Sequence, residues 1–196
     1  MIENEKSKYL GIYRNDSIRL KEYDYSQNGC YFVTICTQDT VPYFSEVVAA
    51  EVKLTFVGEL VNKYWMEIPE HFPFVVLDEY IIMPNHLHGI VCICRDEALP
   101  RPASGDETRS RPCKKDFYSI ISPKTGSLSV IIGSFKSKCT KVVNQHFPEL
   151  KFQWQSRFYE HIIRSEQSLE KIREYIRLNP IKWDTDEINP EYVPKR

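Results

Sequence analysis

Residues 86–94 read His-Leu-His-Gly-Ile-Val-Cys-Ile-Cys, an apolar run of strand length that begins with two histidines. Successive side chains of a strand point to opposite faces of its sheet, so His86, His88 and Ile90 share one face while Leu87 lies on the other. Two imidazoles that leave the same face one residue apart can reach a single metal ion. The stretch therefore predicts a strand with a candidate metal site on one of its faces.

Four other segments are predicted to be strands: residues 31–37, 47–53, 74–83 and 158–163. Residues 31–37 have the strongest pattern, because they are mostly β-branched or aromatic. Pro84-Asn85 is expected to form a turn or a bulge between residues 74–83 and the histidine strand.

Three other segments have the periodicity of helices. A helix is predicted from Thr55 as N-cap up to Pro69, a second from Ser127, and a last one from near Ser165 to Asn179-Pro180. The last helix is expected to end there, because the residue before a proline is disfavoured in the α region. This order of elements predicts an α+β sandwich, with helices on one face of an antiparallel sheet and a C-terminal helix in addition.

The composition favours one folded domain over residues 1–196. The chain has 196 residues, and 42% are hydrophobic, which excludes a disordered protein. Residues 95–126 break the pattern, because their prolines, glycines and charges of both signs predict a long mobile insertion. The formal net charge of −1 means that any nucleic-acid surface has to be a local patch.

The six cysteines are not spaced like metal knuckles, because the chain contains no Cys-x-x-Cys pair. Cys30, Cys36, Cys92 and Cys94 lie in strand-like apolar runs, where we expect reduced thiols that behave as small hydrophobic side chains. With no signal peptide and no long apolar segment, the expected location is the cytoplasm and no membrane partner is expected.

Tyr175 and Asn179 are four residues apart on the last predicted helix, so they leave the same helix face. A helix that crosses the histidine strand on this face brings together two imidazoles, an amide oxygen and a phenol. Mg²⁺ or Mn²⁺ bound by two histidines and an amide keeps positions for phosphate oxygens and water. A phenol beside such a metal can attack a phosphodiester and store its energy in a phosphotyrosine bond.

Each of these motifs also has an ordinary structural explanation. A His-x-His pair alone is a weak motif, a tyrosine on an amphipathic helix often lies at the edge of a core, and an asparagine near a helix end can serve as a cap. His71, His146 and His161 have no such neighbours and are interpreted as structural.

Basic residues gather in the C-terminal third beside Trp154, Phe158 and Tyr159. Cations interleaved with aromatic rings suit single-stranded nucleic acid, with its anionic backbone and stackable bases. We expect DNA contacts from Arg19, Lys136, Lys138, Arg157, Arg164 and Arg177. The alternative is a solvated surface balanced by nearby glutamates.

Taken together, these segments resemble the REP-associated tyrosine transposases, relatives of the small single-strand insertion-sequence transposases in the HUH endonuclease superfamily. The resemblance runs along nearly the whole chain. It is carried by Arg19-Leu20, residues 23–26, 31–37, 77–79 and 83–90, Ser134-Phe135-Lys136-Ser137, Trp154-Gln155, residues 158–164 and 175–180, and Trp183.

The resemblance implies a ferredoxin-like or RRM-like antiparallel sheet and a C-terminal helix that carries the catalytic tyrosine. It implies a divalent metal, Mg²⁺ or Mn²⁺, held by His86, His88 and Asn179. Tyr175 is implied as the nucleophile that becomes linked to a 5′ phosphate of single-stranded DNA near a palindromic hairpin. In related small transposases two subunits exchange the tyrosine helix, so both a monomer and a homodimer are open.

Two other functions compete with transposition. One is a binding module in which an RRM-like sheet holds hairpin nucleic acid without cutting it. The other is a metal-dependent hydrolase in which water attacks the phosphodiester and Tyr175 is structural.

Overall fold

A computed structural model describes residues 23–95 and 126–192. Its centre is a four-stranded antiparallel sheet in the order β4-β5-β1-β6. The strands are β1 (Gly29–Cys36), β4 (Val75–Ile82), β5 (His86–Ile93) and β6 (Tyr159–Ile163). The longer helices are α1 (Phe56–Met66), α4 (Leu128–His146) and α5 (Glu166–Lys182), and α2 (Ile68–His71) is a single turn. The α+β prediction is confirmed.

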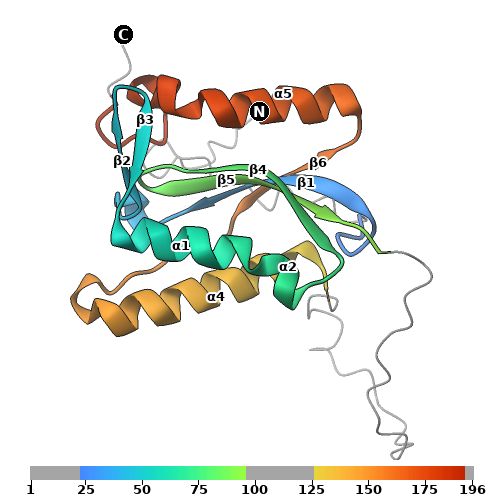
Figure 1. Ribbon diagram of the computed structural model, residues 1–196, viewed down its shortest axis with the longest axis horizontal. Helices are drawn as coiled ribbons and strands as arrows, with labels where there is room; N and C mark the ends of the chain where they lie inside the picture. Colours follow the sequence, from blue (N-terminus) through green and yellow to red (C-terminus); the bar gives the residue numbers. More distant parts are fainter. Residues whose placement is uncertain (1–22, 96–125, 193–196) are drawn as a thin grey trace, which may run out of the picture.

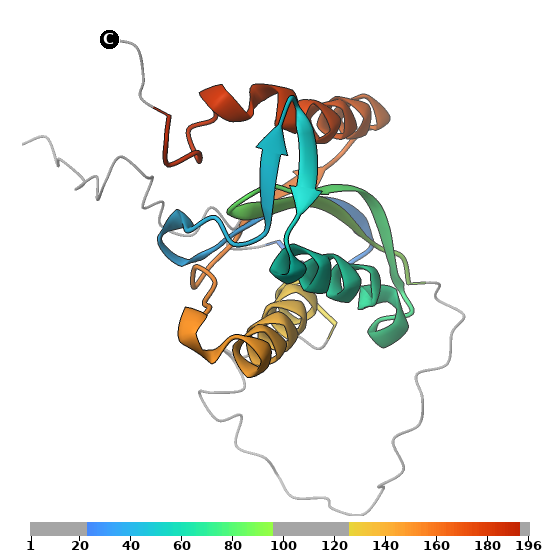
Figure 2. The same ribbon diagram turned by 60° about the vertical axis from the view of Figure 1, so that its left-hand side comes forward.

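The helices form two layers around the sheet. α1 and α4 cover one face, and α5 crosses the other face alone (Figure 1). The view turned by 60° shows the same arrangement, with α5 above the sheet and α1 and α4 below it (Figure 2). The sheet therefore separates the main core, on the side of α1 and α4, from a thinner layer between the sheet and α5.

β5 lies inside the sheet, between β1 and β4, and all eight of its residues are buried. Its register with β1 places His86 opposite Cys36 and His88 opposite Thr34. The predicted alternation is confirmed, because Leu87 packs in the main core while Ile90 packs in the cluster below α5. Both histidines consequently face α5.

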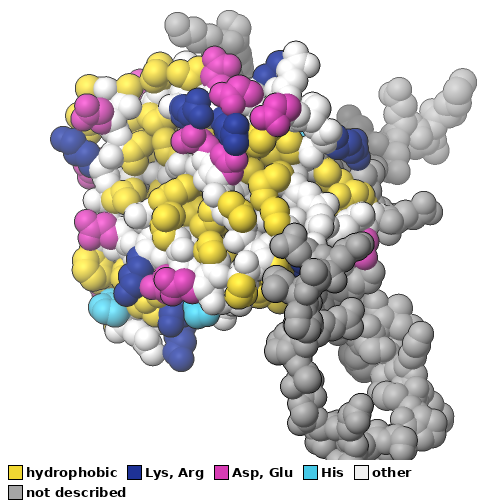
Figure 3. Space-filling view, turned by 45° about the vertical axis from the view of Figure 1, so that its right-hand side comes forward, with side chains coloured by type: hydrophobic (Ala, Val, Ile, Leu, Met, Phe, Trp, Pro, Cys, Tyr) yellow, Lys and Arg dark blue, Asp and Glu magenta, His cyan; other side chains and the backbone are white. Residues whose placement is uncertain are grey.

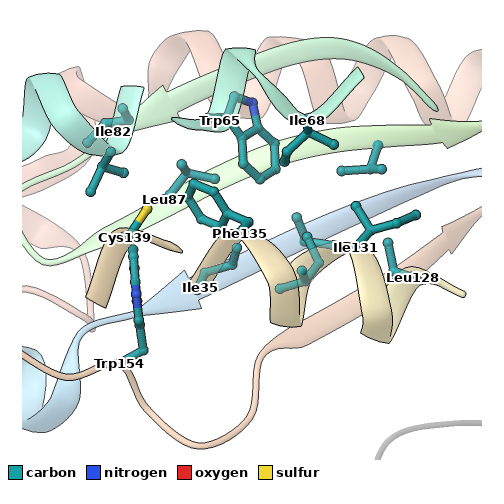
Figure 4. Packing of buried hydrophobic residues seen from close by; sticks show 14 of the residues in the cluster. Ile35, Trp65, Ile68, Ile82, Leu87, Leu128, Ile131, Phe135, Cys139 and Trp154 are labelled. Carbon is teal, nitrogen blue, oxygen red and sulfur yellow. The ribbon is translucent and has the colours of Figure 1, made fainter. Parts of the chain in front are cut away.

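Trp65 of α1 is the largest side chain at the centre of the main core, and it is fully buried. Its ring makes an edge contact with Phe135 of α4 at 5.3 Å between centroids, and Figure 4 shows the two rings together above Ile35 and Leu87. Gly89 leaves space for this indole, since a Cβ there would lie 2.4 Å from Trp65 Cζ2. The glycine in the histidine strand therefore lets α1 pack close to the sheet.

Two predicted boundaries were wrong. Residues 47–53 are not one strand but parts of a hairpin, β2 (Ser45–Val48) and β3 (Glu51–Leu54), turned by Ala49 and Ala50 at φ 52° and 64°. Alanine rarely adopts positive φ, so no turn signal is visible in the sequence.

α5 does not end at Asn179-Pro180 but runs to Lys182, with Pro180 buried inside it. The burial of Asn179, Pro180 and Trp183 outweighs the tendency of Asn179, as the residue before a proline, to avoid the helical conformation.

The expectation of reduced thiols was wrong for one pair, because Cys30 and Cys92 form a disulfide. They lie directly opposite each other in β1 and β5, with Cα atoms 4.0 Å apart, so the strand register brings the two sulfurs together. The pair lies on the α5 face, against the cluster formed by Phe32, Ile90 and Ile176.

The predicted insertion at 95–126 falls almost entirely outside the described residues. In the part of the chain that the structure describes, no helix combines the length and the apolar character needed to cross a bilayer.

The contact between Gly89 and Trp65 generates a stability prediction with a matched control. Gly89→Ala should lower the free energy of unfolding by about 1–3 kcal/mol, because the new methyl group overlaps an indole held in a close-packed core. Gly133→Ala on α4 meets nothing within 4 Å and should raise that free energy by about 0.5–1 kcal/mol. Urea unfolding followed by circular dichroism measures both changes. An unchanged midpoint for Gly89→Ala would show that the indole has room to move.

Candidate active site

β5 presents His86 and His88 side by side toward α5. Both side chains are buried, at 0% and 2% exposure, and their Nε2 atoms lie 3.1 Å apart. Two buried imidazoles are costly unless each polar atom has a partner, so their remaining contacts indicate which nitrogen carries a proton.

The protonation of His86 follows from Asn85. The Asn85 amide nitrogen donates to the carbonyls of Thr40 and Ile188, at 3.1 and 2.8 Å, which leaves its Oδ1 facing His86 Nδ1 at 2.8 Å. An amide oxygen only accepts, so His86 carries its proton on Nδ1. The Nε2 lone pair of His86 therefore points toward His88.

His88 is held by Thr34 on the neighbouring strand. Its Nδ1 lies 2.8 Å from Thr34 Oγ1, and a hydroxyl can either donate to this nitrogen or accept from it. His86 Nε2, which carries the lone pair, lies 3.1 Å from His88 Nε2, so His88 donates to it through Nε2–H. His88 Nδ1 then has no proton and accepts a hydrogen bond from the Thr34 hydroxyl. If a positively charged group bound the Nε2 lone pairs of both histidines, His88 would carry its proton on Nδ1. The Thr34 hydroxyl could then rotate and accept from His88 Nδ1–H.

Both histidines are neutral at physiological pH. Burial lowers the pKa of His88 to about 3, and burial together with the neighbouring His88 lowers the pKa of His86 well below 6.5. Neutral imidazoles with available lone pairs are the form in which histidine binds metals.

α5 brings Tyr175 to this pair. The Tyr175 hydroxyl lies 3.4 Å from His88 Nε2, although 87 residues separate them in the chain. The side chain is 39% exposed, so its hydroxyl is reachable from solvent as well as from the histidines. Burial and the charge of Asp186 raise the pKa of Tyr175, while a hydrogen bond from Asn179 lowers it.

Asn179 is buried at 1% exposure, one turn after Tyr175. Its side chain hydrogen-bonds to Tyr175, and within the described residues its Oδ1 has no hydrogen-bond partner. The amide nitrogen is therefore the group that reaches the phenol, and the oxygen is left with both lone pairs free. A buried acceptor without a partner is costly and marks a place for a ligand.

These donors fit a divalent metal ion. Two neutral imidazoles and an orphaned amide oxygen offer three ligands of the kind that Mn²⁺ and Mg²⁺ accept. No cluster of three or more histidine, cysteine, aspartate or glutamate side chains suited to a metal occurs among the described residues. Asn179 stays the predicted third ligand, and its unpartnered Oδ1 is compatible with that role.

Sequence reasoning missed three side chains of this site. Asn85 was interpreted only as part of a turn, and Thr34 and Phe32 only as part of a strand. Asn85 and Thr34 orient the two histidines, and Phe32 stacks on His88 with 5.3 Å between ring centroids. Asn85 directly precedes the first histidine, which was a usable signal. Thr34 and Phe32 depend on the register of β1 with β5, which the sequence does not display.

Comparison with known proteins agrees with this geometry. A family model described as transposase IS200 like matches residues 117–179, which include Tyr175 and Asn179. An uncharacterized protein of Haemophilus influenzae is 35% identical over 182 residues, which are 91% of this chain and 94% of that protein. A second Haemophilus influenzae protein, named as a REP-associated tyrosine transposase, is 28% identical over 81% of this chain and 74% of its own length.

The chain belongs to the IS200-like transposase family.

A solved structure of a REP-associated tyrosine transposase bound to a REP hairpin has the same fold as this family member. It aligns with a TM-score of 0.52 and 21% identity, over 84% of this chain and 73% of that one. The sheet and its helices are thus shared with a transposase of known structure.

The residues predicted to contact DNA have different surroundings in this transposase-family chain. Lys138, Arg157 and Arg164 are exposed. Lys136 is half-buried, and its ammonium donates to the backbone carbonyls of Gln155 and Arg157. Arg177 donates to Glu79, and Arg19 lies outside the described residues. Their contacts with DNA stay a prediction.

The lowered pKa values predict acid sensitivity of the metal-free protein. An unfolded histidine titrates near ~6.5, so below this pH the unfolded state binds more protons than the folded state, and stability falls as pH falls. A folded pKa of about 3 for His88 corresponds to a loss of about 2 kcal/mol at pH 5, and His86 adds to it. Urea unfolding of chelator-treated protein at pH 7.5, 6 and 5 measures this loss.

His88→Gln should flatten this pH dependence, whereas replacing the exposed His161 by glutamine should leave it intact. Equal curves for wild type and His88→Gln would mean that the buried pair does not control the acid response.

Proposed function

We propose that this protein cuts and rejoins single-stranded DNA near palindromic hairpins through a covalent 5′-phosphotyrosine intermediate, with a divalent metal as cofactor. One observation carries the proposal: the Tyr175 hydroxyl lies 3.4 Å from Nε2 of His88, which is one of two buried, neutral imidazoles with Nε2 atoms 3.1 Å apart. A metal-dependent hydrolase has no need of a phenol at this place, and a binding module has no need of the donor set.

His86, His88 and Asn179 are the residues that would hold the metal. When bound, the ion supplies positive charge that polarises the scissile phosphate and favours the phenolate. His86 already carries its proton on Nδ1, where Asn85 accepts it. For His88 to offer its Nε2 lone pair to the metal, its proton would have to be on Nδ1, and Thr34 Oγ1 could then accept from it. Such a change of tautomer would require no net release of a proton.

Tyr175 supplies the nucleophile. Its oxygen forms a bond to the phosphorus while the bond from phosphorus to the 3′ oxygen breaks, which leaves a 5′-phosphotyrosine and a free 3′ hydroxyl. The phenol proton balances the proton gained by the 3′ oxygen. Because burial and Asp186 raise the pKa of Tyr175, the hydroxyl is protonated in the resting protein. The Asn179 amide lowers that pKa and so stabilises the phenolate during attack.

The substrate class rests on the family and on the solved relative that is bound to a REP hairpin. The exposed Arg157 and Arg164 flank the two ends of β6, whose first residue is the exposed Tyr159, and they suit the phosphates and bases of a single strand. Within the single chain described, α5 lies on its own sheet and Tyr175 lies beside its own histidines, which is compatible with a monomer that acts in cis. We place this activity in the cytoplasm.

The decisive experiment incubates the protein with labelled single-stranded hairpin DNA and Mn²⁺, then separates the products on a denaturing protein gel. The wild type should give a metal-dependent band of covalent protein–DNA adduct. Tyr175→Phe should abolish it, because the nucleophilic oxygen is gone. Tyr43→Phe is the matched control, since this tyrosine packs against the main core, on the other side of the sheet from His88.

Other outcomes would replace the proposal. Cleavage without an adduct, unchanged by Tyr175→Phe, would establish the hydrolase. Tight hairpin binding without any cleavage, and insensitive to His88→Ala, would establish the binding module.

The contact of Thr34 with His88 predicts a change in metal affinity. Thr34→Val keeps the shape but removes the hydroxyl that would accept from His88 Nδ1–H when a metal is bound. The affinity for Mn²⁺, measured by calorimetry, should fall roughly 10- to 100-fold. Thr34→Ser retains a hydroxyl and should stay near the wild-type value. If valine and serine bind Mn²⁺ equally well, Thr34 does not support the metal site.

A further inference from the structure

Asp78 and Glu79 are consecutive residues of β4, yet both carboxylates reach α5. In a regular strand one of them would point to the opposite face. β4 contains a bulge here, because Leu77 pairs with Val91 while Tyr80 pairs with Gly89, which leaves one extra residue on β4. Leu77 and Tyr80 both pack in the main core, so the two residues between them are left to the face of α5.

The two carboxylates bind two arginines of α5. Arg173 donates to Asp78 through two nitrogens, from Nε to Oδ1 at 2.9 Å and from Nη2 to Oδ2 at 2.6 Å. Arg177 donates from Nε to Glu79 Oε2 at 2.9 Å. Glu170 on α5 adds a third carboxylate, 3.2 Å from Arg173 and 3.5 Å from Arg177. Figure 3 shows acidic and basic side chains side by side along the upper part of the molecule, where α5 lies.

The arginines lie on one flank of α5 and the catalytic residues on the other. Residues two apart on a helix point roughly 200° away from each other, so Arg173 and Arg177 are on the far flank from Tyr175 and Asn179. Ile176 lies between the two flanks and packs into the cluster with Phe32 and Ile90. A rotation of α5 about its own axis would therefore displace Tyr175 relative to His88 and, at the same time, Arg173 relative to Asp78.

We propose that Asp78 and Glu79 are positioning residues, which fix the rotation of α5 about its axis and so hold the Tyr175 hydroxyl beside His88. This inference rests on the proposed function and adds to it. Apolar packing under Ile176 sets the depth of the helix but has no directional preference. A bidentate arginine–carboxylate pair is directional in both position and angle.

The surroundings of the pairs support this role. The Asp78 and Arg173 side chains are only 23% and 26% exposed, whereas Arg177 and Glu170 are more than half exposed. The guanidinium of Arg173 lowers the pKa of Asp78, so this carboxylate is charged over the whole working range of pH. Arg173–Asp78 is thus the better-defined contact, and Arg177–Glu79 supplements it.

The test uses Asp78→Asn in the full-length protein, because asparagine keeps the size and removes the charge. The rate of adduct formation in a single turnover, at saturating hairpin DNA and Mn²⁺, should fall roughly 10- to 100-fold, as expected for a displaced nucleophile. The dissociation constant for the same DNA should stay at the wild-type value. Hydrogen exchange should become faster for the amides of α5 and stay unchanged for those of β1 and β5.

Exchange of the two charges provides the rescue. Asp78→Arg and Arg173→Asp should each slow the reaction, and the double variant should recover most of the rate. Glu67→Gln is the matched control, because it removes the same charge from a surface pair with Lys63 on α1, at 3.9 Å. It should change neither the rate nor the exchange of α5.

A normal adduct rate for Asp78→Asn would overturn the proposal, and so would an equal loss in Glu67→Gln. Weaker DNA binding with an unchanged saturated rate would also overturn it, because the acidic residues would then act on substrate binding. If the wild type forms no adduct, the proposed function fails. In that case the exchange of α5 amides still decides whether Asp78 fixes the helix, since it requires no DNA.

Discussion

The structure depends on the burial of β5 on both faces. One face packs on Trp65 and α4 through Leu87 and the space left by Gly89, and the other presents His86 and His88 to α5. A strand that carries two histidines in its interior is stable only when their polar atoms are satisfied. Asn85 and Thr34 do this from the turn and from β1, so the histidines are oriented by the same contacts that make their burial tolerable. The fold and the candidate site therefore depend on the same requirement, that the polar atoms of the two buried histidines have hydrogen-bond partners.

Much of this arrangement was predictable from residue periodicity. Alternation along residues 86–94 identified the face of the histidines, and the i, i+4 spacing placed Tyr175 and Asn179 together, because both follow from the geometry of a single element. Contacts between elements were not predictable. Thr34 meets His88 only through the β1–β5 register, and Cys30 meets Cys92 for the same reason. Asp78 and Glu79 are two consecutive acidic residues, and the sequence does not reveal that a bulge turns both toward α5.

Errors in the expected element boundaries had two different physical origins. The hairpin turn uses Ala49 and Ala50 at positive φ, where the usual signal is glycine or asparagine, so local chemistry was uninformative. At Pro180 the local signal was clear but lost to packing, because the buried turn that contains Asn179 and Pro180 continues α5 toward Trp183. The same extra turn keeps Asn179 within a regular helix, which maintains its alignment with Tyr175. Tertiary burial thus preserved the spacing on which the site depends.

Tyr175 and His88 lie in separate parts of the chain, 87 residues apart, and meet only through the docking of α5. Three requirements act on that helix: its depth, its position along the strand and its rotation. Apolar contacts of Ile176 with Phe32 and Ile90 set the depth of α5 on the sheet. They do not fix its rotation, because small rotations that keep the apolar stripe buried leave nearly the same buried apolar area. A reacting oxygen tolerates far less freedom than a buried surface does. The bulge in β4 answers this need, because it gives one flank of α5 a directional contact while Tyr175 lies on the opposite flank, beside His88.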